Sequence, residues 1–247
     1  MAKARKFPES IDRAANGFCP GCGHGVAIRL IAECLEELEQ DKNLIYGIGV
    51  GCSSLLGGIL ETDRRHCSHG RAGAVCTGVK RVNPDNLVIA YQGDGDAYSI
   101  GLAETTAAAY RNENITVFII NNTNYGMTGG QMSHTTMPGQ VTTTSPHGRN
   151  CDITGYPMKF PEIVASQFNA AYVARGAINT VPQINKTRTY IKNALEAQMN
   201  KEGYSVVEIL STCPTNWGMS PVDAKKRLTD ELIPYYPLGE LKAREVK

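Results

Sequence analysis

Two apolar runs, each followed at once by a polar loop, constrain the fold of this chain more than any other feature. Residues 87–91 precede Gly93-Asp94-Gly95-Asp96, and residues 115–120 precede Asn121-Asn122-Thr123-Asn124. Both runs are short and rich in β-branched and aromatic residues, so they predict buried strands, and the Ala-rich residues 98–111 predict a helix between them. Parallel strands joined in this way bind ligands beyond their carboxyl ends. We therefore expect an α/β fold with three layers and a mostly parallel sheet.

Composition excludes several classes of protein. The 247 residues carry 25 basic and 24 acidic side chains, a net charge of +1, which gives no electrostatic reason to bind nucleic acid or an anionic membrane. No apolar run is long enough to span a membrane, and the basic residues near the start precede no apolar core of a targeting signal. We expect a cytoplasmic protein, with residues 1–247 forming one domain that ends in a C-terminal arm from about residue 218.

Four of the eight cysteines stand out by their context, and all four lie in predicted loops. Without a secretion signal, so many cysteines favour metal or redox chemistry over disulfide bonds. Cys19 and Cys22 have the CxxC spacing of half a metal or cluster site, which is also that of a redox pair, and Cys52 and Cys213 each follow a predicted strand. Four thiolates can hold zinc or a [4Fe–4S] cluster. One close pair with two single cysteines favours the cluster.

The two polar loops offer oxygen ligands for a cation. Asp94 supplies a carboxylate, Asn122 an amide oxygen and Asn124 a backbone carbonyl, while Gly93 and Gly95 let a diphosphate approach the backbone. With two diphosphate oxygens and one water, these groups complete the six ligands that Mg²⁺ prefers. The pattern predicts a magnesium–diphosphate site, and a GDG turn without a ligand is the alternative.

Three further polar residues stand in Gly-containing segments. His24 follows the CxxC turn, and we expect it to line a pocket or cap the following helix. His69 and Arg71 are expected to face an anionic ligand or a catalytic cavity, although a helix N-terminus with satisfied side chains explains them equally well. The long polar stretch from residue 132 to residue 157 has the composition of a lid or a subunit contact.

The spacing of the two polar motifs resembles a known cofactor signature. A GDG triplet separated from an Asn pair by residues 96–120 resembles the thiamine diphosphate motif. Together with CPGCG, GCSS, HGR, YGMTGGQ and STCPTNWG, the chain resembles the β subunit of the 2-oxoacid:ferredoxin oxidoreductases, most of all the 2-oxoisovalerate type. The likeness extends from residue 18 to about residue 238.

The resemblance implies specific ligands. It implies that Asp94, Asn122 and the carbonyl of Asn124 bind Mg²⁺, and that His24, His69 and Arg71 are candidates for the catalytic pocket. The cluster ligands that it implies are Cys19, Cys22, Cys52 and Cys213. The residues beside thiamine diphosphate would be Gly93, Asp94, Gly95, Asp96, Asn122, Asn124, Gly126 and Met127.

The same resemblance implies a reaction and partners. The family carries out coenzyme A-dependent oxidative decarboxylation of a 2-oxoacid to acyl-CoA and CO₂, and electrons pass through a [4Fe–4S] cluster to ferredoxin. The cofactor lies between two subunits, so we expect a hetero-oligomer with an α subunit that supplies the pyrimidine-binding domain, and with γ and ferredoxin-like δ subunits.

Three residues bear on the choice of substrate. Some relatives that act on 2-oxoglutarate carry Lys at the positions of Leu55 or Gly129, and this chain lacks that cation. Leu55 and Met127 offer apolar surface that suits branched-chain 2-oxoisovalerate; 2-oxoglutarate is the alternative. More distant alternatives are a non-oxidative thiamine diphosphate decarboxylase or synthase, and a zinc-binding structural subunit.

Overall fold

One twisted sheet forms the centre of the molecule. The computed structural model describes residues 6–12 and 17–245, and within them the strands form a single seven-stranded sheet. The strands are β1 (Leu44–Ile48), β2 (Asp63–His66), β3 (Leu87–Gly93), β4 (Thr116–Asn121), β5 (Tyr172–Ala177), β6 (Ser205–Leu210) and β7 (Gly239–Lys242). Their order is β2-β1-β3-β4-β6-β5-β7, and every neighbouring pair is parallel except β5 with β7. The mostly parallel sheet predicted from the sequence is confirmed.

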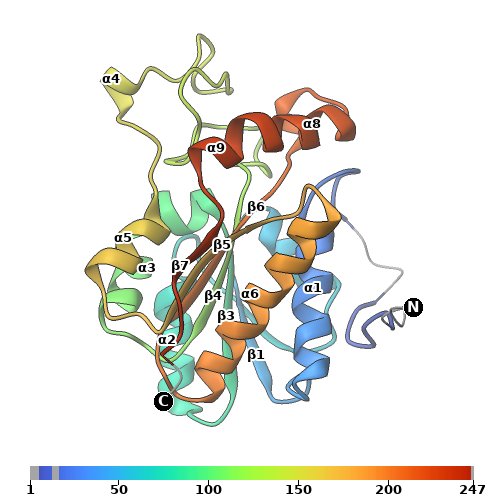
Figure 1. Cartoon of the computed structure of the whole chain (residues 1–247), viewed down its shortest axis with the longest axis vertical. Coiled ribbons are helices and arrows are strands. Elements are labelled where there is room, and N and C mark those ends of the chain that lie inside the picture. The colour runs from blue at the N-terminus through green and yellow to red at the C-terminus, as the bar shows by residue number, and fades with distance from the viewer. Residues whose placement is uncertain (1–5, 13–16, 246–247) are drawn as a thin grey trace.

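Helices cover both faces of this sheet (Figure 1). The α-helices are α1 (His24–Glu37), α2 (Ala72–Val82), α3 (Leu102–Tyr110), α4 (Cys151–Thr154), α5 (Phe160–Gln167), α6 (Val181–Met199), α7 (Pro214–Trp217), α8 (Pro221–Arg227) and α9 (Ile233–Tyr235). Three short segments are the 3₁₀ helix η1 (Cys52–Gly58) and the π-helical η2 (Asp96–Ile100) and η3 (Leu228–Leu232). Helices α1 and α6 lie on one face and α2, α3 and α5 on the other. In the described part of the chain, no helix is both long and apolar enough to cross a membrane.

The alternation of side chains along β3 shows why the sheet is covered on both sides. Leu87, Ile89 and Tyr91 pack in the core cluster that contains α1 and α6, whereas Val88 and Ala90 pack in the cluster that contains α2, α3 and α5. Successive side chains of a strand point to opposite faces. A strand buried on both faces therefore needs a continuous apolar run, as residues 87–91 provide.

The two outermost strands were not predicted. All four residues of β2 are exposed, and β7 is at most half-buried, so neither strand carries an apolar pattern. The C-terminal segment, which we expected to be an arm, enters α9 and then pairs antiparallel with β5 through β7. Edge strands need little apolar burial, which explains the missing signal. The basic segment at residues 1–10 lies partly outside the described residues.

The helix expected at residues 98–111 is divided in two. The π-helical η2 ends at Ile100 and α3 begins at Leu102, with Gly101 between them. A side chain at Gly101 would collide with the carbonyl oxygen of Gly70. The close approach of these two glycines brings the loop that carries His69 against the start of the helix.

A long loop connects β4 to α5. As the composition predicted, residues 122–159 contain little regular structure, and α4 is the one helix of this stretch. Buried Arg149 organises the loop, because its guanidinium donates to the carbonyl oxygens of Ser133 (3.4 Å), His134 (3.2 Å) and Thr136. The loop lies with α8 and α9 beyond the carboxyl ends of the strands (Figure 1).

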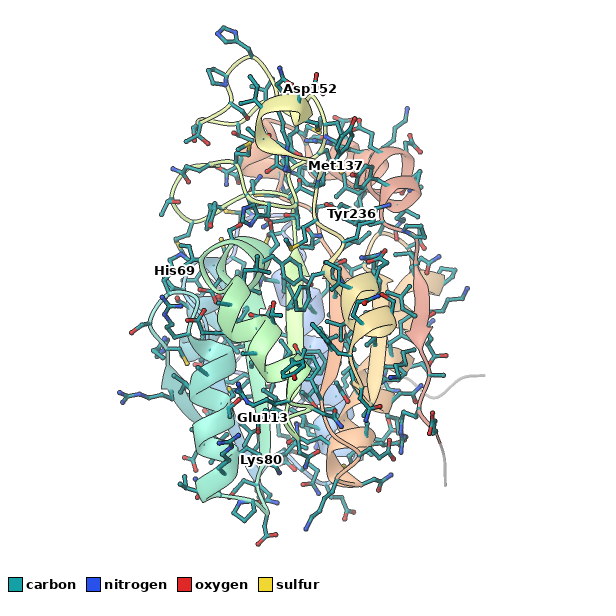
Figure 2. The ribbon with its side chains drawn as sticks, turned by 90° about the vertical axis from the view of Figure 1, so that its left-hand side faces the viewer. His69, Lys80, Glu113, Met137, Asp152 and Tyr236 are labelled. Atoms are coloured by element: carbon teal, nitrogen blue, oxygen red, sulfur yellow. The ribbon has the colours of Figure 1, made fainter. Side chains whose placement is uncertain are left out.

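The loop and the C-terminal helices share a small apolar cluster. Met137 packs with Leu228, Leu232 and Tyr236 in this cluster. Figure 2 shows Met137 and Tyr236 beyond the end of the sheet nearer to His69, whereas Lys80 and Glu113 lie toward the opposite end. The cluster holds the long loop over the sheet edge at which both polar motifs end.

Candidate functional site

A cavity of about 110 Å³ opens at the carboxyl ends of β1, β3 and β4. Its lining combines both polar motifs with the loop that follows β1. The lining residues are His24, Val50, Gly51, Cys52, His69, Gly93, Asp94, Gly95, Asp96, Asn122, Asn124, Tyr125, Gly126, Met127 and Thr128. The structure thus brings together most of the site residues that the sequence predicts.

Three oxygen atoms converge on one side of this cavity. Asn122 Oδ1 lies 3.1 Å from Asp94 Oδ1 and 2.7 Å from the carbonyl oxygen of Asn124. As the Asn122 amide is placed, both are contacts between two oxygen atoms with no hydrogen-bond donor. Exchanging the amide oxygen and nitrogen would convert both contacts to hydrogen bonds. A divalent cation bound by oxygen ligands satisfies the same three atoms without that turn. The residues therefore fit the magnesium ion that the sequence predicts.

The electrostatics of Asp94 also favour a cation. Its side chain is 1% exposed, and burial raises its pKa to about 6, although hydrogen bonds from Thr135 and Ser133 act in the opposite direction. A buried carboxylate is costly to charge without a positive partner. A metal ion at Asp94 Oδ1 would supply that partner.

Two glycines shape the floor of the cavity. A Cβ on Gly95 would lie 2.5 Å from the ring of Tyr125, whose hydroxyl donates to the carbonyl oxygen of Gly95 at 3.0 Å. A Cβ on Gly93, by contrast, would have no atom within 4 Å. Gly95 is therefore needed for packing, whereas Gly93 borders open space where a ligand can approach the backbone.

Asp96 lines the cavity but serves another side chain. Its Oδ1 lies 2.5 Å from Nδ1 of His69 and accepts the Gly70 amide at 2.7 Å, and its Oδ2 accepts Nε2 of Gln92 at 2.6 Å. Both carboxylate oxygens are thus engaged by the protein. This arrangement fixes the His69 ring, and it gives Asp96 a more specific task than the diphosphate contact expected from the sequence.

His24 is the first residue of α1 and is almost fully buried. Its Nδ1 lies 2.7 Å from the hydroxyl oxygen of Tyr91, and its ring stacks on Phe18 with 5.0 Å between the centroids. Burial lowers the pKa of His24 to about 3. The imidazole is therefore neutral at physiological pH, and it makes no side-chain cap to the helix.

Three residues that the sequence placed at the site do not line the cavity. Arg71 pairs with Glu104, Leu55 is half-buried in η1, and Gly129 is exposed in a left-handed conformation with φ of 106°. Of the three predicted substrate residues, Met127 alone lines the cavity, and it is 46% exposed.

The four predicted cluster cysteines lie near one another, and one of them, Cys52, lines this cavity. Burial raises the pKa of Cys22 to about 11 and that of Cys52 to about 12, and charge on Cys213 or Cys19 would raise both further. Such mutual influence requires the four sulfur atoms to lie within electrostatic reach of one another. A Cβ on Gly126 would lie 3.1 Å from Cys52 Sγ, so Cys52 adjoins the segment after β4.

The geometry of these sulfur atoms bears on the kind of metal site. Within residues 6–12 and 17–245, no three His, Cys, Asp or Glu side chains gather closely enough to hold a metal ion. A [4Fe–4S] cluster binds each of its four cysteines through a different iron atom, so its ligands surround the cluster and do not meet at one ion. The cluster at Cys19, Cys22, Cys52 and Cys213 stays a prediction.

A larger cavity, of about 610 Å³, lies at the opposite end of the sheet. Asn112, Asn200 and Arg244 line it, and the guanidinium of Arg244 is already paired with Glu196 and Glu202. Its main cation is therefore satisfied within the protein, and the smaller cavity at the carboxyl edge remains the candidate site.

Comparison with known proteins agrees with this geometry. The family model described as thiamine pyrophosphate enzyme, C-terminal TPP binding domain, matches residues 49–209. The chain belongs to the thiamine pyrophosphate enzymes. The matched residues include both polar motifs and Cys52.

Individual relatives narrow the family. Ketoisovalerate oxidoreductase subunit VorA of Methanothermobacter thermautotrophicus is 40% identical over 233 residues, which are 94% of this chain and 49% of the relative. 2-Oxoglutarate synthase subunit KorB of Methanothermobacter marburgensis is 36% identical over 228 residues, 90% of this chain and 76% of the relative. The motif-based resemblance to 2-oxoacid:ferredoxin oxidoreductase subunits is thus confirmed. The chain spans about half the length of its VorA relatives.

A solved structure shares the fold. The 2-oxoglutarate:ferredoxin oxidoreductase from Magnetococcus marinus, solved with 2-oxoglutarate, coenzyme A and succinyl-CoA bound, superposes with a TM-score of 0.80 at 27% identity. The match covers 97% of this chain and 85% of that one. The predicted α/β fold with a thiamine-pyrophosphate-binding domain is confirmed.

Proposed function

We propose that this chain is the thiamine-pyrophosphate-binding subunit of a 2-oxoacid:ferredoxin oxidoreductase. The reaction converts a 2-oxoacid and coenzyme A to acyl-CoA and CO₂, and the electrons pass through a [4Fe–4S] cluster to ferredoxin. The observation that carries this proposal is one cavity lined both by Asp94, Asn122 and Asn124 and by Cys52. A magnesium–diphosphate site and a cluster cysteine on the same cavity suit decarboxylation coupled to electron transfer.

Different residues of the chain would bind the metal, make room for the diphosphate and transfer a proton. Asp94, Asn122 and the Asn124 carbonyl would hold Mg²⁺, and Gly93 would leave room for the diphosphate. When bound, thiamine pyrophosphate supplies the electron sink for loss of CO₂, and the cluster accepts one electron at a time. His69, fixed at Nδ1 by Asp96, would move a proton at Nε2.

His24 and Arg71 have smaller parts in this proposal. Neutral His24 would line the pocket without carrying charge, since Tyr91 engages its Nδ1. Arg71 is paired with Glu104 outside the cavity, so we assign it no contact with substrate.

The cluster would be held by Cys19, Cys22, Cys52 and Cys213. Asn216 supports the last of these, because its Nδ2 lies 3.4 Å from Cys213 Sγ and also donates to the carbonyl oxygen of Gly126 at 2.7 Å. Hydrogen bonds to ligating sulfur atoms tune the reduction potential of such clusters. Asn216 thereby connects a cluster ligand to the segment that lines the cofactor cavity.

The substrate is proposed to be 2-oxoisovalerate. Among the described residues that line the cavity, none is Lys or Arg, so no cationic side chain there would pair with the second carboxylate of 2-oxoglutarate. Met127 offers apolar surface. The alternative is 2-oxoglutarate, the substrate named for the KorB relative and for the Magnetococcus marinus enzyme.

The partners are proposed from the family. The resemblance implies that the cofactor lies between two subunits, and the VorA relatives are about twice as long as this chain. We propose that an α subunit with the pyrimidine-binding domain completes the cofactor site, that γ and ferredoxin-like δ subunits complete the complex, and that the complex is cytoplasmic. The chain itself would act as one domain whose C-terminal segment, from about residue 218, braces the site.

The test of this function is a substrate panel. We expect the complex, purified anaerobically with its partner subunits, to reduce ferredoxin or a viologen when given coenzyme A and a 2-oxoacid. 2-Oxoisovalerate should exceed 2-oxoglutarate in kcat/KM by on the order of 10-fold or more, because the second carboxylate would be buried without a partner. A preference for 2-oxoglutarate would overturn the substrate assignment. Absence of reduction with every 2-oxoacid would overturn the function.

The cluster is tested separately by removing one ligand. We expect this subunit of the wild-type protein to bind about four iron atoms per chain. Cys213→Ser should lose most of them, because one of the four ligating thiolates is gone. Iron analysis and visible absorbance of the anaerobic protein measure both. Cys151→Ser is the matched control, since this free cysteine lies in α4, away from the cavity lining. Zinc in place of iron, or full iron content in the Cys213 variant, would contradict the assignment.

A further inference from the structure

The two oxygens of the Asp94 carboxylate have different surroundings. Oδ1 faces Asn122 Oδ1 at 3.1 Å, on the side where the three oxygens converge, and accepts the Asn122 backbone amide at 3.4 Å. Oδ2 accepts hydrogen bonds from Ser133 Oγ at 2.7 Å and from Thr135 Oγ1. Asp94, Ser133 and Thr135 are each at most 3% exposed. Water therefore has no access to take the place of either hydroxyl.

The two hydroxyls saturate Oδ2. Each hydroxyl carries one hydrogen, and a carboxylate oxygen can accept two hydrogen bonds. Ser133 Oγ and Thr135 Oγ1 also lie 2.8 Å apart, within hydrogen-bond distance of each other, so the two hydroxyls and Oδ2 form one buried network. This arrangement resists rotation of the carboxylate and leaves Oδ1, with its long 3.4 Å hydrogen bond from the Asn122 amide, as the oxygen that can face a metal.

The turn that carries the hydroxyls is itself tied to the cation loop. Thr136 Oγ1 accepts the Ser133 amide at 2.9 Å and donates to the carbonyl oxygen of Thr123 at 2.7 Å. Thr123 stands between Asn122 and Asn124 in the sequence. The residues that orient Asp94 are therefore fixed relative to the other two oxygens of the site.

The C-terminal segment braces the same turn from the other side. The hydroxyl of Tyr236 donates to the carbonyl oxygen of Thr135 at 2.8 Å, and its ring lies 5.2 Å from the Arg175 guanidinium. Tyr236 lies beyond the end of the sheet near which His69 is placed (Figure 2). The long loop and the C-terminus thus meet behind the carboxylate.

We propose that Ser133 and Thr135 are positioning residues for the metal site, which hold Asp94 so that it presents Oδ1 alone to the cation. The proposal rests on the proposed function, since it concerns the magnesium of that site. Partners of a metal ligand that do not themselves touch the metal set its orientation, and their loss typically costs ~10–100-fold in metal affinity. A merely structural role would change the stability of the loop without changing how cofactor binding depends on Mg²⁺.

The test measures that dependence in the assembled complex. We expect Ser133→Ala/Thr135→Val to raise the Mg²⁺ concentration for half-maximal binding of thiamine pyrophosphate by ~10–100-fold, as followed by calorimetry. At saturating Mg²⁺ the affinity for thiamine pyrophosphate should return toward the wild-type value. The single variant Thr135→Ser, which keeps the hydroxyl, should have the same Mg²⁺ requirement as wild type. Thr143→Val, at an exposed threonine of the same loop, is the matched control.

The outcomes distinguish failure of the positioning role from failure of the proposed function. If wild type shows Mg²⁺-dependent binding and the double variant has the same Mg²⁺ requirement, the positioning role is wrong and the proposed function stands. If wild type shows no Mg²⁺-dependent binding, the proposed function fails and the positioning role fails with it. If the double variant does not fold, Ser133→Ala decides alone, because it deletes a single hydroxyl: an unchanged Mg²⁺ requirement overturns the proposal and a raised one supports it.

Discussion

Replacing Asp94 with asparagine is expected to abolish magnesium-dependent binding of thiamine pyrophosphate while the chain stays folded. The substitution removes the one carboxylate among the three converging oxygens. The loss should exceed the ~10–100-fold that removing an outer partner of a metal ligand typically costs, because the ligand itself is lost. Calorimetry on the assembled complex, with and without Mg²⁺, measures it.

The cofactor-free variant should be at least as stable as wild type. An asparagine amide in place of Asp94 Oδ1 would donate to Asn122 Oδ1, now 3.1 Å away, in exchange for the long 3.4 Å hydrogen bond that Oδ1 accepts from the Asn122 backbone. The retained oxygen would still accept from Ser133 and Thr135. Burial also holds the pKa of Asp94 well above its usual value, so the native carboxylate is not stabilised by the empty site. Thermal unfolding without ligand measures this directly.

Adding Mg²⁺ and thiamine pyrophosphate then separates the two proteins. Wild type should gain about 2.7 kcal/mol when the ligand is at 100 times its Kd, and the Asp94→Asn variant should gain nothing. Asp85→Asn, at an exposed aspartate before β3, is the control and should respond like wild type. Full magnesium-dependent stabilisation of the Asp94 variant would show that the metal binds elsewhere.

The sequence predicts those site residues that are close together in the chain or that parallel strand pairing brings to one edge of the sheet. Gly93 ends β3 and Asp94 follows it, and Asn122 follows β4, which pairs with β3 in parallel register. Parallel pairing alone brings the ends of adjacent strands to one edge. The buried strands were equally predictable, since a strand covered on both faces must be apolar throughout.

The parts that were missed depend on packing over long sequence distances. Ser133 and Thr135 contact Asp94 across 39 and 41 residues, and they stand in a loop with many similar hydroxyl residues. No local pattern distinguishes them from their neighbours. A buried carboxylate needs donors, however, so a search for hydroxyl pairs in the loop predicted to cover Asp94 could have found the Ser-x-Thr spacing.

Two motif residues have partners within the protein that the sequence did not predict, and their roles at the ligand stay predictions. Arg71 lies beside His69 in the sequence, yet it pairs with Glu104 and does not line the cavity. Asp96 belongs to the predicted diphosphate motif, yet His69, Gly70 and Gln92 engage both of its oxygens. Sequence spacing places the backbone at the site, but competition among side chains decides which of them face the ligand.

Replacing Arg175 with methionine is expected to destabilise the chain more than any change at its surface. Arg175 in β5 is fully buried, pairs with equally buried Glu208 in β6, and binds both oxygens of Glu162 at 2.6 Å. Burial alone would lower the pKa of Arg175, but the two glutamates outweigh it and raise that pKa above its usual value. Without the guanidinium, Glu208 would be a buried charge with no ion-pair partner.

The expected cost is large because the ion pair is buried. Removing one partner of a buried pair costs roughly 3–5 kcal/mol, which for a chain of this size lowers the melting temperature by roughly 6–20 °C. The effect should extend to the site, because Glu208 Oε1 accepts from Asn121 Nδ2 at 3.3 Å and Asn121 Oδ1 accepts the Thr123 amide at 3.1 Å. Thiamine pyrophosphate binding should therefore weaken in the folded fraction as well.

Two further variants show whether the unpaired charge is the cause. Arg175→Met/Glu208→Gln should recover part of the lost stability, since it removes the orphaned carboxylate along with its partner. Arg81→Met breaks an ion pair with Glu113 in which the arginine is 62% exposed, and it should cost no more than about 1 kcal/mol. If Arg175→Met unfolds no more readily than Arg81→Met, the buried network does not stabilise the fold. If the double variant is less stable than Arg175→Met alone, the loss comes from packing around Glu208 and not from its charge.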